Sequence, residues 1–430
     1  MRPLRIAFLV YRGNPHSGGQ GVYTRHLTRE LTALGHHVEV FSGQPYPDLD
    51  HGVGLVAVPS LDLYRQPDPF RVPRPSELRS PIDVLEFAIM CTAGFPEPLT
   101  FSLRARRMLA DRRDQFDLVH DNQCLGRGML GLMADGWPLL TTVHHPITVD
   151  RDLEMAHAVG WQRRLSVRRW YGFLAMQLEV VRQLPAIVTV STSSATDIVA
   201  HMGVDPTRLS VVPVGVDTSR WRPLVGVERI PGRLMTTASA DVPMKGLVPL
   251  LEALAKVRTE RHAELVVVGR PRRETQVTAT IERLGLGQAV CFVSDLADQD
   301  IVELYAQAEV AVVPSLYEGF SLPAIEAMAC GVPVVATTGG ALPEVIGTDG
   351  VTGLLVPPGD PGALAMALGR ALDDADLRER LGAAGRERVC RRFTWRATAE
   401  ATVEQYRALL GGRVPGPQVA EGGLTAAGVD

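Results

Sequence analysis

Lysine is almost absent from this chain of 430 residues, in which Lys245 and Lys256 stand beside 42 arginines. Arginine therefore supplies the positive surface charge, and a lysine kept in a loop favours a specific role. An excess of one charge is also missing, because 44 basic residues face 48 acidic ones and the net charge is −4. Nucleic-acid-binding domains usually carry a strong basic excess, so the composition argues against a nucleic-acid partner.

Cysteine and long apolar runs are scarce as well. The five cysteines are widely separated, and no C-x-x-C pair occurs. This excludes a disulfide framework and a structural zinc site, and it predicts a cytoplasmic protein. No run of 18 uncharged apolar residues is present, so no membrane span is predicted. The short apolar run at residues 6–10 lacks a cleavage site and is interpreted as a first strand.

What the chain does have is the composition of a globular protein, with 46% hydrophobic and 21% charged residues. Its length predicts at least two cores. Short apolar runs alternate with helical patterns, which is typical of parallel sheets with crossover helices. We therefore predict the α/β class, with two Rossmann-like, doubly wound domains facing each other across a cleft. The expected strands are 5–10, 38–41, 53–58, 117–120, 139–143, 186–190, 233–238, 264–268, 289–293, 310–313 and 333–336.

The expected domain organisation follows from where these patterns change. An N-terminal domain is predicted over 1–217 and a C-terminal domain over 218–392. A helix over 393–411 is expected to pack back on the first domain, and the Gly/Pro-rich tail 412–430 to be disordered. A proline-rich excursion over 59–98 should carry one short helix near 81–91, and 152–183 has a helical pattern.

The most informative segment is PSLYEGFSLPAIEAMACGVPVV, residues 314–335, which follows an apolar strand. A glycine-containing loop there opens a helix whose first-turn proline is Pro323, and such a helix start binds anions. Glu318 lies in the loop and Glu326 on the helix, so a phosphate held between them would place a sugar near Glu318 and a ribose near Glu326. The alternative interpretation is an ordinary helix start stabilised by its dipole.

This segment resembles the signature of the retaining glycosyltransferases of family 4, which have the GT-B architecture. The resemblance extends over about residues 4–410 and is densest over 233–360. It implies a hexosyltransferase that uses a nucleoside-diphosphate sugar and an acceptor hydroxyl, with His144, Lys245 and Glu318 at the reaction centre. His144 ends the segment TTVH, and Lys245 lies in the loop before a helix. The donor-binding residues implied by the resemblance are Gly18, Gly19, Lys245, Gly269, Arg270, Val293, Glu318, Gly319, Phe320, Ser321, Leu322 and Glu326.

One position departs from the family pattern. Family members usually carry an arginine five residues before the lysine, and here that residue is Ala240. Arg12, Arg233 and Arg270 are the candidates to replace its positive charge beside the diphosphate. No D-x-D pair is placed for a metal ion, so a metal-independent reaction without a cofactor is expected.

Several alternatives stay open at this point. The donor could be UDP-glucose, UDP-N-acetylglucosamine or GDP-mannose, and the acceptor a lipid, a saccharide or a small molecule. A non-catalytic nucleotide-sugar-binding partner and an epimerase or hydrolase are the competing functions. The arginines and tryptophans of 161–171 predict a solvated helix with its aromatics packed inward, and a weak peripheral membrane contact is the other interpretation. The sequence does not indicate the oligomeric state.

Overall fold

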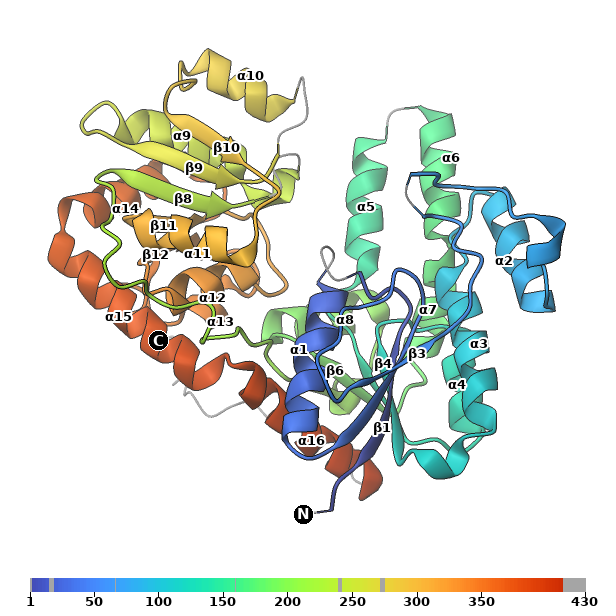
Figure 1. The fold of residues 1–430 in the computed structure, drawn as a ribbon. Helices are drawn as coiled ribbons and strands as arrows, with labels where there is room; N and C mark the ends of the chain where they lie inside the picture. The colour runs from blue at the N-terminus through green and yellow to red at the C-terminus, as the bar shows by residue number, and fades with distance from the viewer. Residues whose placement is uncertain are drawn as a thin grey trace, which may run out of the picture. The chain divides into compact units, whose positions relative to one another are not determined.

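A computed structural model describes residues 2–14, 19–65, 67–158, 160–238, 242–270 and 275–412. Its contacts divide the chain into two compact units. Unit 1 comprises residues 1–190, 194–213 and the segment from Thr398 onward, and unit 2 comprises 191–193 and 214–397. Each unit is built on its own parallel sheet (Figure 1).

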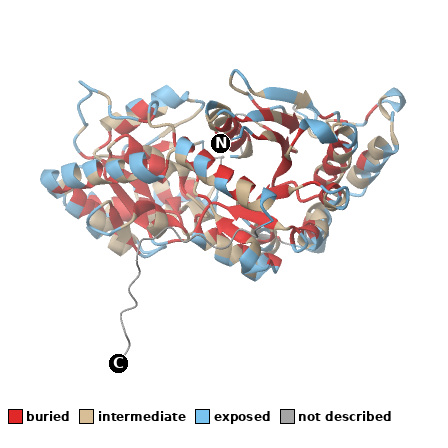
Figure 2. Ribbon diagram, turned by 90° about the horizontal axis from the view of Figure 1, so that it is seen from below, coloured by how far each residue is buried: buried red, intermediate tan, exposed pale blue. Residues whose placement is uncertain are grey.

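Unit 1 contains a seven-stranded sheet in the order β3-β2-β1-β4-β5-β6-β7, and every neighbouring pair of strands is parallel. The central strands are buried along nearly their whole length (Figure 2), because helices cover a parallel sheet on both faces. The strands are β1 (Arg5–Val10), β2 (His37–Ser42), β3 (Gly54–Ala57), β4 (Leu118–Asn122), β5 (Leu139–Thr142), β6 (Ala186–Thr189) and β7 (Leu209–Val211).

The helices of unit 1 follow the expected alternation, with one difference. The pattern over 152–183 predicted continuous helix, but the chain forms several shorter helices there, because Gly160 adopts a φ of 83° that ends helical geometry. The main helices are α1 (Gln20–Ala33), α2 (Pro81–Cys91), α3 (Glu97–Ala110), α4 (Arg127–Ala134), α5 (Ile147–His157), α6 (Trp161–Trp170), α7 (Leu174–Val181) and α8 (Thr192–Met202), and α16 (Trp395–Leu410) joins unit 1 from Thr398.

Unit 2 repeats the architecture with a six-stranded parallel sheet in the order β10-β9-β8-β11-β12-β13. Alternate side chains of each strand enter different cores. Leu234 of β8 packs into the core around α9 and α14, whereas its neighbour Met235 packs into the core around α11 and α12. The strands are β8 (Arg233–Thr237), β9 (Glu264–Val268), β10 (Val290–Val293), β11 (Val310–Val313), β12 (Val334–Thr337) and β13 (Leu354–Val356).

The helices of unit 2 cover both faces of this sheet (Figure 1). No helix of the described ranges is long and apolar enough to cross a membrane. The helices are α9 (Leu247–Val257), α10 (Gln276–Arg283), α11 (Asp298–Gln307), α12 (Leu322–Ala329), α13 (Leu342–Ile346), α14 (Pro361–Asp373) and α15 (Ala375–Arg392).

Both sheets have a point where the strand order reverses. In unit 1 it lies between β1 and β4, and in unit 2 between β8 and β11. Crossover helices leave the sheet in opposite directions at such a point, so a crevice opens outside the carboxyl ends of the two strands. In each sheet, the topology therefore predicts a ligand site at the carboxyl ends of the two strands where the order reverses. We call this side of each sheet its carboxyl edge.

Candidate functional site

In unit 2 the reversal point holds a lysine and a glutamate in direct contact. The Nζ of Lys245 lies 2.8 Å from Oε1 of Glu318, and the Ser315 hydroxyl donates to the same oxygen at 2.6 Å. Glu318 is almost fully buried, whereas the Lys245 side chain is about one-third exposed. The Glu318 carboxylate is thus held by hydrogen bonds from within the protein, whereas the Lys245 ammonium is partly open to solvent.

The backbone brings these two side chains together through neighbouring loops. Gly246 begins α9 with a φ of 67°, and a Cβ there would lie 1.9 Å from the carbonyl oxygen of Pro314. The Leu316 N–H donates to the carbonyl of Met244 at 2.7 Å, which joins the β8–α9 loop to the β11–α12 loop. The two loops therefore meet beside Lys245, and α9 begins at Leu247, two residues after this lysine, so the first N–H groups of that helix add positive potential near its charge.

The third loop of this edge packs against Glu318. The Ala341 N–H donates to the Glu318 carbonyl at 2.8 Å, and a Cβ at Gly340 would lie 2.2 Å from that same oxygen. Gly340 also has a φ of 62°, which glycine adopts without strain. The loop after β12 therefore fixes the backbone of the loop that carries Glu318.

Glu326 lies on α12, whose first turn is capped by the Ser321 hydroxyl accepting from the Ala324 N–H at 3.4 Å. Burial, with a smaller contribution from Asp298, raises the pKa of Glu326 to about 8. At neutral pH most of the carboxyl group is protonated, so it can donate one hydrogen bond and accept another. A carboxyl group of this kind can hydrogen-bond to two neighbouring hydroxyl groups, donating to one and accepting from the other.

The other predicted donor contacts lie along the same region. Gly319 to Leu322 form the end of the loop and the start of α12, and Phe320 packs edge-on against Phe393. Gly269 follows β9 and Val293 ends the neighbouring β10, with the Gly269 N–H donating to the Val293 carbonyl at 2.8 Å. Arg270 is exposed and pairs with Asp295. The structure thus places these residues at the carboxyl edge of the unit 2 sheet.

In unit 1, His144 follows β5, and its neighbours determine which of its ring nitrogens donates a hydrogen bond and which accepts one. The Asn122 amide nitrogen donates to Thr24 Oγ1 at 3.2 Å, and this hydroxyl itself donates to the Gln20 carbonyl. The Asn122 oxygen therefore faces His144, whose Nε2 lies 2.8 Å away and must donate to it. Burial lowers the His144 pKa to about 3, so the ring is neutral and its Nδ1 is a hydrogen-bond acceptor.

A buried polar network behind His144 was not predicted from the sequence. The His120 ring is fully buried, with Nδ1 2.6 Å from the Tyr406 hydroxyl and Nε2 2.7 Å from Thr142 Oγ1. The Tyr23 hydroxyl lies 3.3 Å from the same Thr142 oxygen, and its ring meets His144 edge-on at 4.7 Å. The network therefore connects α16 to His144. The spacing of these residues in the sequence gives no signal for it, because its partners are up to 286 positions apart.

Two predicted features lie outside the described residues, namely Gly18 and Ala240. Gly19 is described and precedes α1 with a φ of 71°. Gly21, which belongs to the same glycine-rich loop, has the tighter constraint, since a Cβ there would lie 1.9 Å from the Asn14 carbonyl oxygen. The glycines of this loop thus serve both its conformation and its packing.

The three arginines considered as replacements for the missing one differ in position. Arg233 begins β8 and pairs with Glu264 at 2.6 Å, so it lies at the amino end of the strand that Lys245 follows, and the suggestion for Arg233 is wrong. Arg12 follows β1 and lies 3.5 Å from Glu97, and Arg270 follows β9. Arg12 and Arg270 both lie at the carboxyl edges of their sheets.

Two further expectations concern metals and the arginine-rich helix. Within the described residues, no group of three or more His, Cys, Asp or Glu side chains could hold a metal ion. On α6, Trp170 packs against Tyr64 and Phe95, whereas Trp161 is 72% exposed. The expectation of inward-facing aromatics thus holds for Trp170 and is wrong for Trp161.

Comparison with known proteins gives the same division of the chain. Residues 17–220 match the family described as "Glycosyltransferase Family 4", and residues 231–388 match "Glycosyl transferases group 1". Among solved structures, sucrose-phosphate synthase from Thermosynechococcus elongatus has a TM-score of 0.71 and 25% identity, and the alignment covers 95% of this chain and all of that one.

Relatives in sequence cover almost the whole chain as well. The MMP alpha-(1->4)-mannosyltransferase of Mycolicibacterium hassiacum is 54% identical over 404 residues, which is 94% of this chain and 98% of that protein. D-inositol 3-phosphate glycosyltransferase 2 of Catenulispora acidiphila is 30% identical, over 94% and 95% of the two chains. The chain therefore belongs to the family 4 glycosyltransferases of the GT-B superfamily, and it is a glycosyltransferase.

Proposed function

We propose that this protein transfers a mannosyl group from a nucleoside-diphosphate mannose to a saccharide hydroxyl, and that it forms an α-(1→4) linkage with retention at the anomeric carbon. The observation that carries the transfer is the Lys245 ammonium, which lies directly before the start of α9 and contacts Glu318 in the loop that leads to α12. The choice of mannose and of the linkage is supported by the 54% identity to the mannosyltransferase.

In this reaction the bond between the anomeric carbon and the diphosphate oxygen breaks. The acceptor oxygen bonds to the carbon, and its proton passes to the departing diphosphate. The group that needs stabilisation is then the diphosphate anion. Lys245 and the N–H groups of the helix starts supply positive charge fixed in place before the reaction, which is the most effective electrostatic arrangement and needs no metal.

Glu318 has a different part in this proposal. Its Oε1 already accepts from Lys245 and Ser315, and two such bonds lower the nucleophilicity of a carboxylate. We therefore assign Glu318 to a contact with the donor sugar and to orienting Lys245. The acceptor hydroxyl then attacks on the face that the diphosphate leaves, without a covalent intermediate on the protein.

The test is thermal stabilisation by GDP-mannose, UDP-glucose and UDP-N-acetylglucosamine, with and without EDTA, followed by linkage analysis of the product. A ligand at about 100 times its Kd stabilises by about 2.7 kcal/mol. We expect GDP-mannose to stabilise the protein regardless of EDTA and to yield an α-(1→4)-mannoside. Stabilisation without product on any acceptor would favour a non-catalytic binding partner, and release of free mannose would favour a hydrolase.

A further inference from the structure

The backbone that carries His144 is held by one buried side chain, that of Gln123. The Gln123 amide oxygen accepts from the His144 backbone N–H at 2.7 Å, and its amide nitrogen donates to the His145 carbonyl at 2.8 Å. Gln123 is only 2% exposed, so this amide is engaged with the protein and not with solvent. Both polar atoms of the amide are therefore used, and they fix the chain at His144 and His145.

This contact continues the pairing of β4 with β5 beyond the end of their backbone ladder. Asn122, the last residue of β4, lies opposite Thr142, the last residue of β5. The ladder ends there because Gln123 has a φ of 55°, which a strand cannot contain. Its side-chain amide carries a donor and an acceptor, as a peptide group does, and takes the place of the next backbone partner.

The loop after β4 has a backbone shape that side chains seldom allow. Gln123 and Leu125 both have left-handed φ angles, of 55° and 53°, which are unfavourable for residues with long side chains. The buried Asp121 carboxyl group holds this shape, because its oxygens accept from the Cys124 N–H at 3.2 Å and from the Leu125 N–H at 3.1 Å. Strained backbone of this kind persists only where the surrounding structure imposes it. The imposed shape is the one that directs the Gln123 amide to residues 144 and 145.

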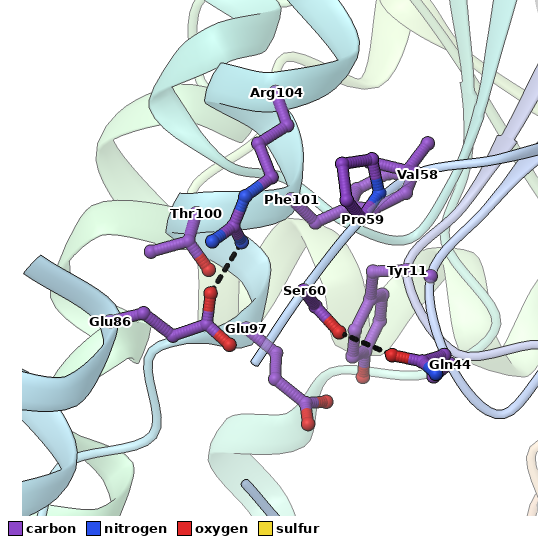
Figure 3. A pocket seen from close by; sticks show the side chains of 11 residues that line it. Tyr11, Gln44, Val58, Pro59, Ser60, Glu86, Glu97, Thr100, Phe101 and Arg104 are labelled. Carbon is purple, nitrogen blue, oxygen red and sulfur yellow. Dashed lines mark hydrogen bonds and ion pairs between the residues drawn. The ribbon is translucent and has the colours of Figure 1, made fainter. Parts of the chain in front are cut away.

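The same loop packs against α3. A Cβ at Gly126 would lie 2.2 Å from the Pro98 carbonyl oxygen, and the Cys124 thiol donates to that oxygen at 3.1 Å. A different face of α3, with Phe101 and Arg104, lines the narrow pocket shown in Figure 3. The enclosed space of this pocket is about 10 Å³, which is room for one water molecule. The helix that supports the loop is therefore closely packed on both of these faces, which keeps the loop rigid.

Two consecutive residues thus hold His144, since Asn122 accepts from the ring Nε2 and Gln123 holds the backbone. We propose that Gln123 is a positioning residue for His144. It fixes the backbone from which the imidazole ring projects, and it thereby directs the ring Nδ1 to the sugar that is transferred. The proposal rests on the proposed function, because it requires that the His144 ring contacts the donor sugar.

The test is a double-mutant cycle on kcat with Gln123→Met and His144→Ala. Methionine is about as long as glutamine but makes neither hydrogen bond, so the His144 backbone is free to shift. Because a displacement of about 1 Å can cost about 100-fold in rate, we expect Gln123→Met to lower kcat by about 10- to 100-fold. The Kd of GDP, which lacks the sugar, should change by less than about twofold. In the His144→Ala background the same substitution should alter kcat by less than about twofold, because the ring that Gln123 positions is gone.

Gln123→Asn separates positioning from a role in the fold of the loop. Asparagine adopts left-handed backbone more readily than glutamine, but its side chain is one carbon shorter and does not reach residues 144 and 145 together. We expect Gln123→Asn to unfold at or above the thermal midpoint of Gln123→Met and yet to lose as much kcat, and it provides the measurement if Gln123→Met does not fold. Gln183→Met is the matched control, since Gln183 is an exposed glutamine that donates to the Glu179 carbonyl, and its kcat should stay within about twofold of wild type.

Two kinetic results would overturn the inference. One is an equally large loss in the His144→Ala background, which would show that Gln123 does not act through His144, and the other is a wild-type kcat in Gln123→Asn. NMR of the histidine rings needs no turnover, and the His144 ring signals should shift in Gln123→Met, so unchanged signals would overturn the inference as well. Absence of mannosyl transfer by the wild-type protein would instead contradict the proposed function, and the ring signals would still decide whether Gln123 positions His144.

Discussion

At the scale of single residues, the chain has only two lysines, so Lys256 can serve as the control for Lys245. Lys245 contacts Glu318 and lies directly before the start of α9, whereas Lys256 is exposed near the end of the same helix. In the proposed reaction Lys245→Ala removes a positive charge beside the leaving diphosphate, so kcat/KM should fall on the order of 10²-fold or more. Steady-state kinetics should show Lys256→Ala within about twofold of wild type. Equal losses in the two variants would mean that Lys245 has no specific part in transfer.

A second prediction at this scale concerns the polarity of His144. Asn122 holds Nε2 as a donor, and burial keeps the ring neutral, with a pKa of about 3. In Asn122→Asp a carboxylate faces the same N–H and favours the imidazolium, which should raise the His144 pKa by about 1–3 units. Protonation then occupies Nδ1, so activity should fall on the acidic side of the pH profile.

The measurement is the pH dependence of kcat/KM for both proteins, together with NMR titration of the ring. Asn122→Gln keeps an amide and serves as the uncharged comparison. A raised His144 pKa with an unchanged pH profile of kcat/KM would show that His144 Nδ1 does not contact the substrate.

At the scale of elements, the sequence predicted best where burial imposes a simple pattern. The strand β11 is apolar throughout, and β1 and β9 are apolar after a charged first residue, because helices cover both faces of a parallel sheet. β7 and β13 have three residues each, too few to show any period. The break within 152–183 depends on the backbone of Gly160, which hydrophobic periodicity does not report.

The site followed the same rule. Lys245 and Glu318 were predicted as site residues because they lie in loops with recognisable local sequence, and the structure brings the two side chains to 2.8 Å of each other. Ser315, which bonds to Glu318, lies within the recognised segment but was given no role there, and Asn122, which bonds to His144, has no motif of its own. Partners that complete a hydrogen bond are chosen by tertiary geometry, so they become visible only once the loops are placed.

The helix α16 gives a prediction about an element. Its Tyr406 is fully buried, and its hydroxyl bonds to His120 Nδ1 at 2.6 Å. Tyr406→Phe leaves that ring nitrogen without a partner in the core, which should lower the free energy of unfolding by about 1–3 kcal/mol. Urea unfolding measures this, with the partly exposed Tyr46→Phe as the control. An unchanged free energy of unfolding would mean that water bonds to the His120 ring nitrogen as favourably as the Tyr406 hydroxyl does.

At the scale of the whole molecule, the two units share one design. Each is a parallel sheet whose reversal point lies beside loops rich in glycine and polar side chains. Three carboxyl groups near these strand ends are protonated more readily in the folded chain than in the unfolded one. Burial raises the pKa of Glu97 and Glu326 to about 8, and that of Asp121 to about 7. The ligand-binding edges therefore affect how stability depends on pH.

The direction of that dependence can be worked out. A carboxyl whose folded pKa is raised binds a proton in the folded state where the unfolded chain has lost it, so stability falls as pH rises toward the folded pKa. His120 and His144, with folded pKa values of about 3, act in the opposite direction, but only up to the unfolded pKa of about 6.5. Between pH 6.5 and pH 8 the buried carboxyls act without this opposition.

We therefore expect the free energy of unfolding to fall as pH rises from about 6.5 to about 8, by up to about 1 kcal/mol per pH unit for each carboxyl. The thermal unfolding midpoint should fall over the same interval. Glu326→Gln removes one titrating group and should flatten this decline. Glu179→Gln, an exposed carboxyl, should leave it unchanged. A midpoint that stays constant or rises over this interval would show that these carboxyls are already ionised in the folded protein, and Glu326 would then be an anion that accepts two hydroxyl protons instead of a neutral group that donates one.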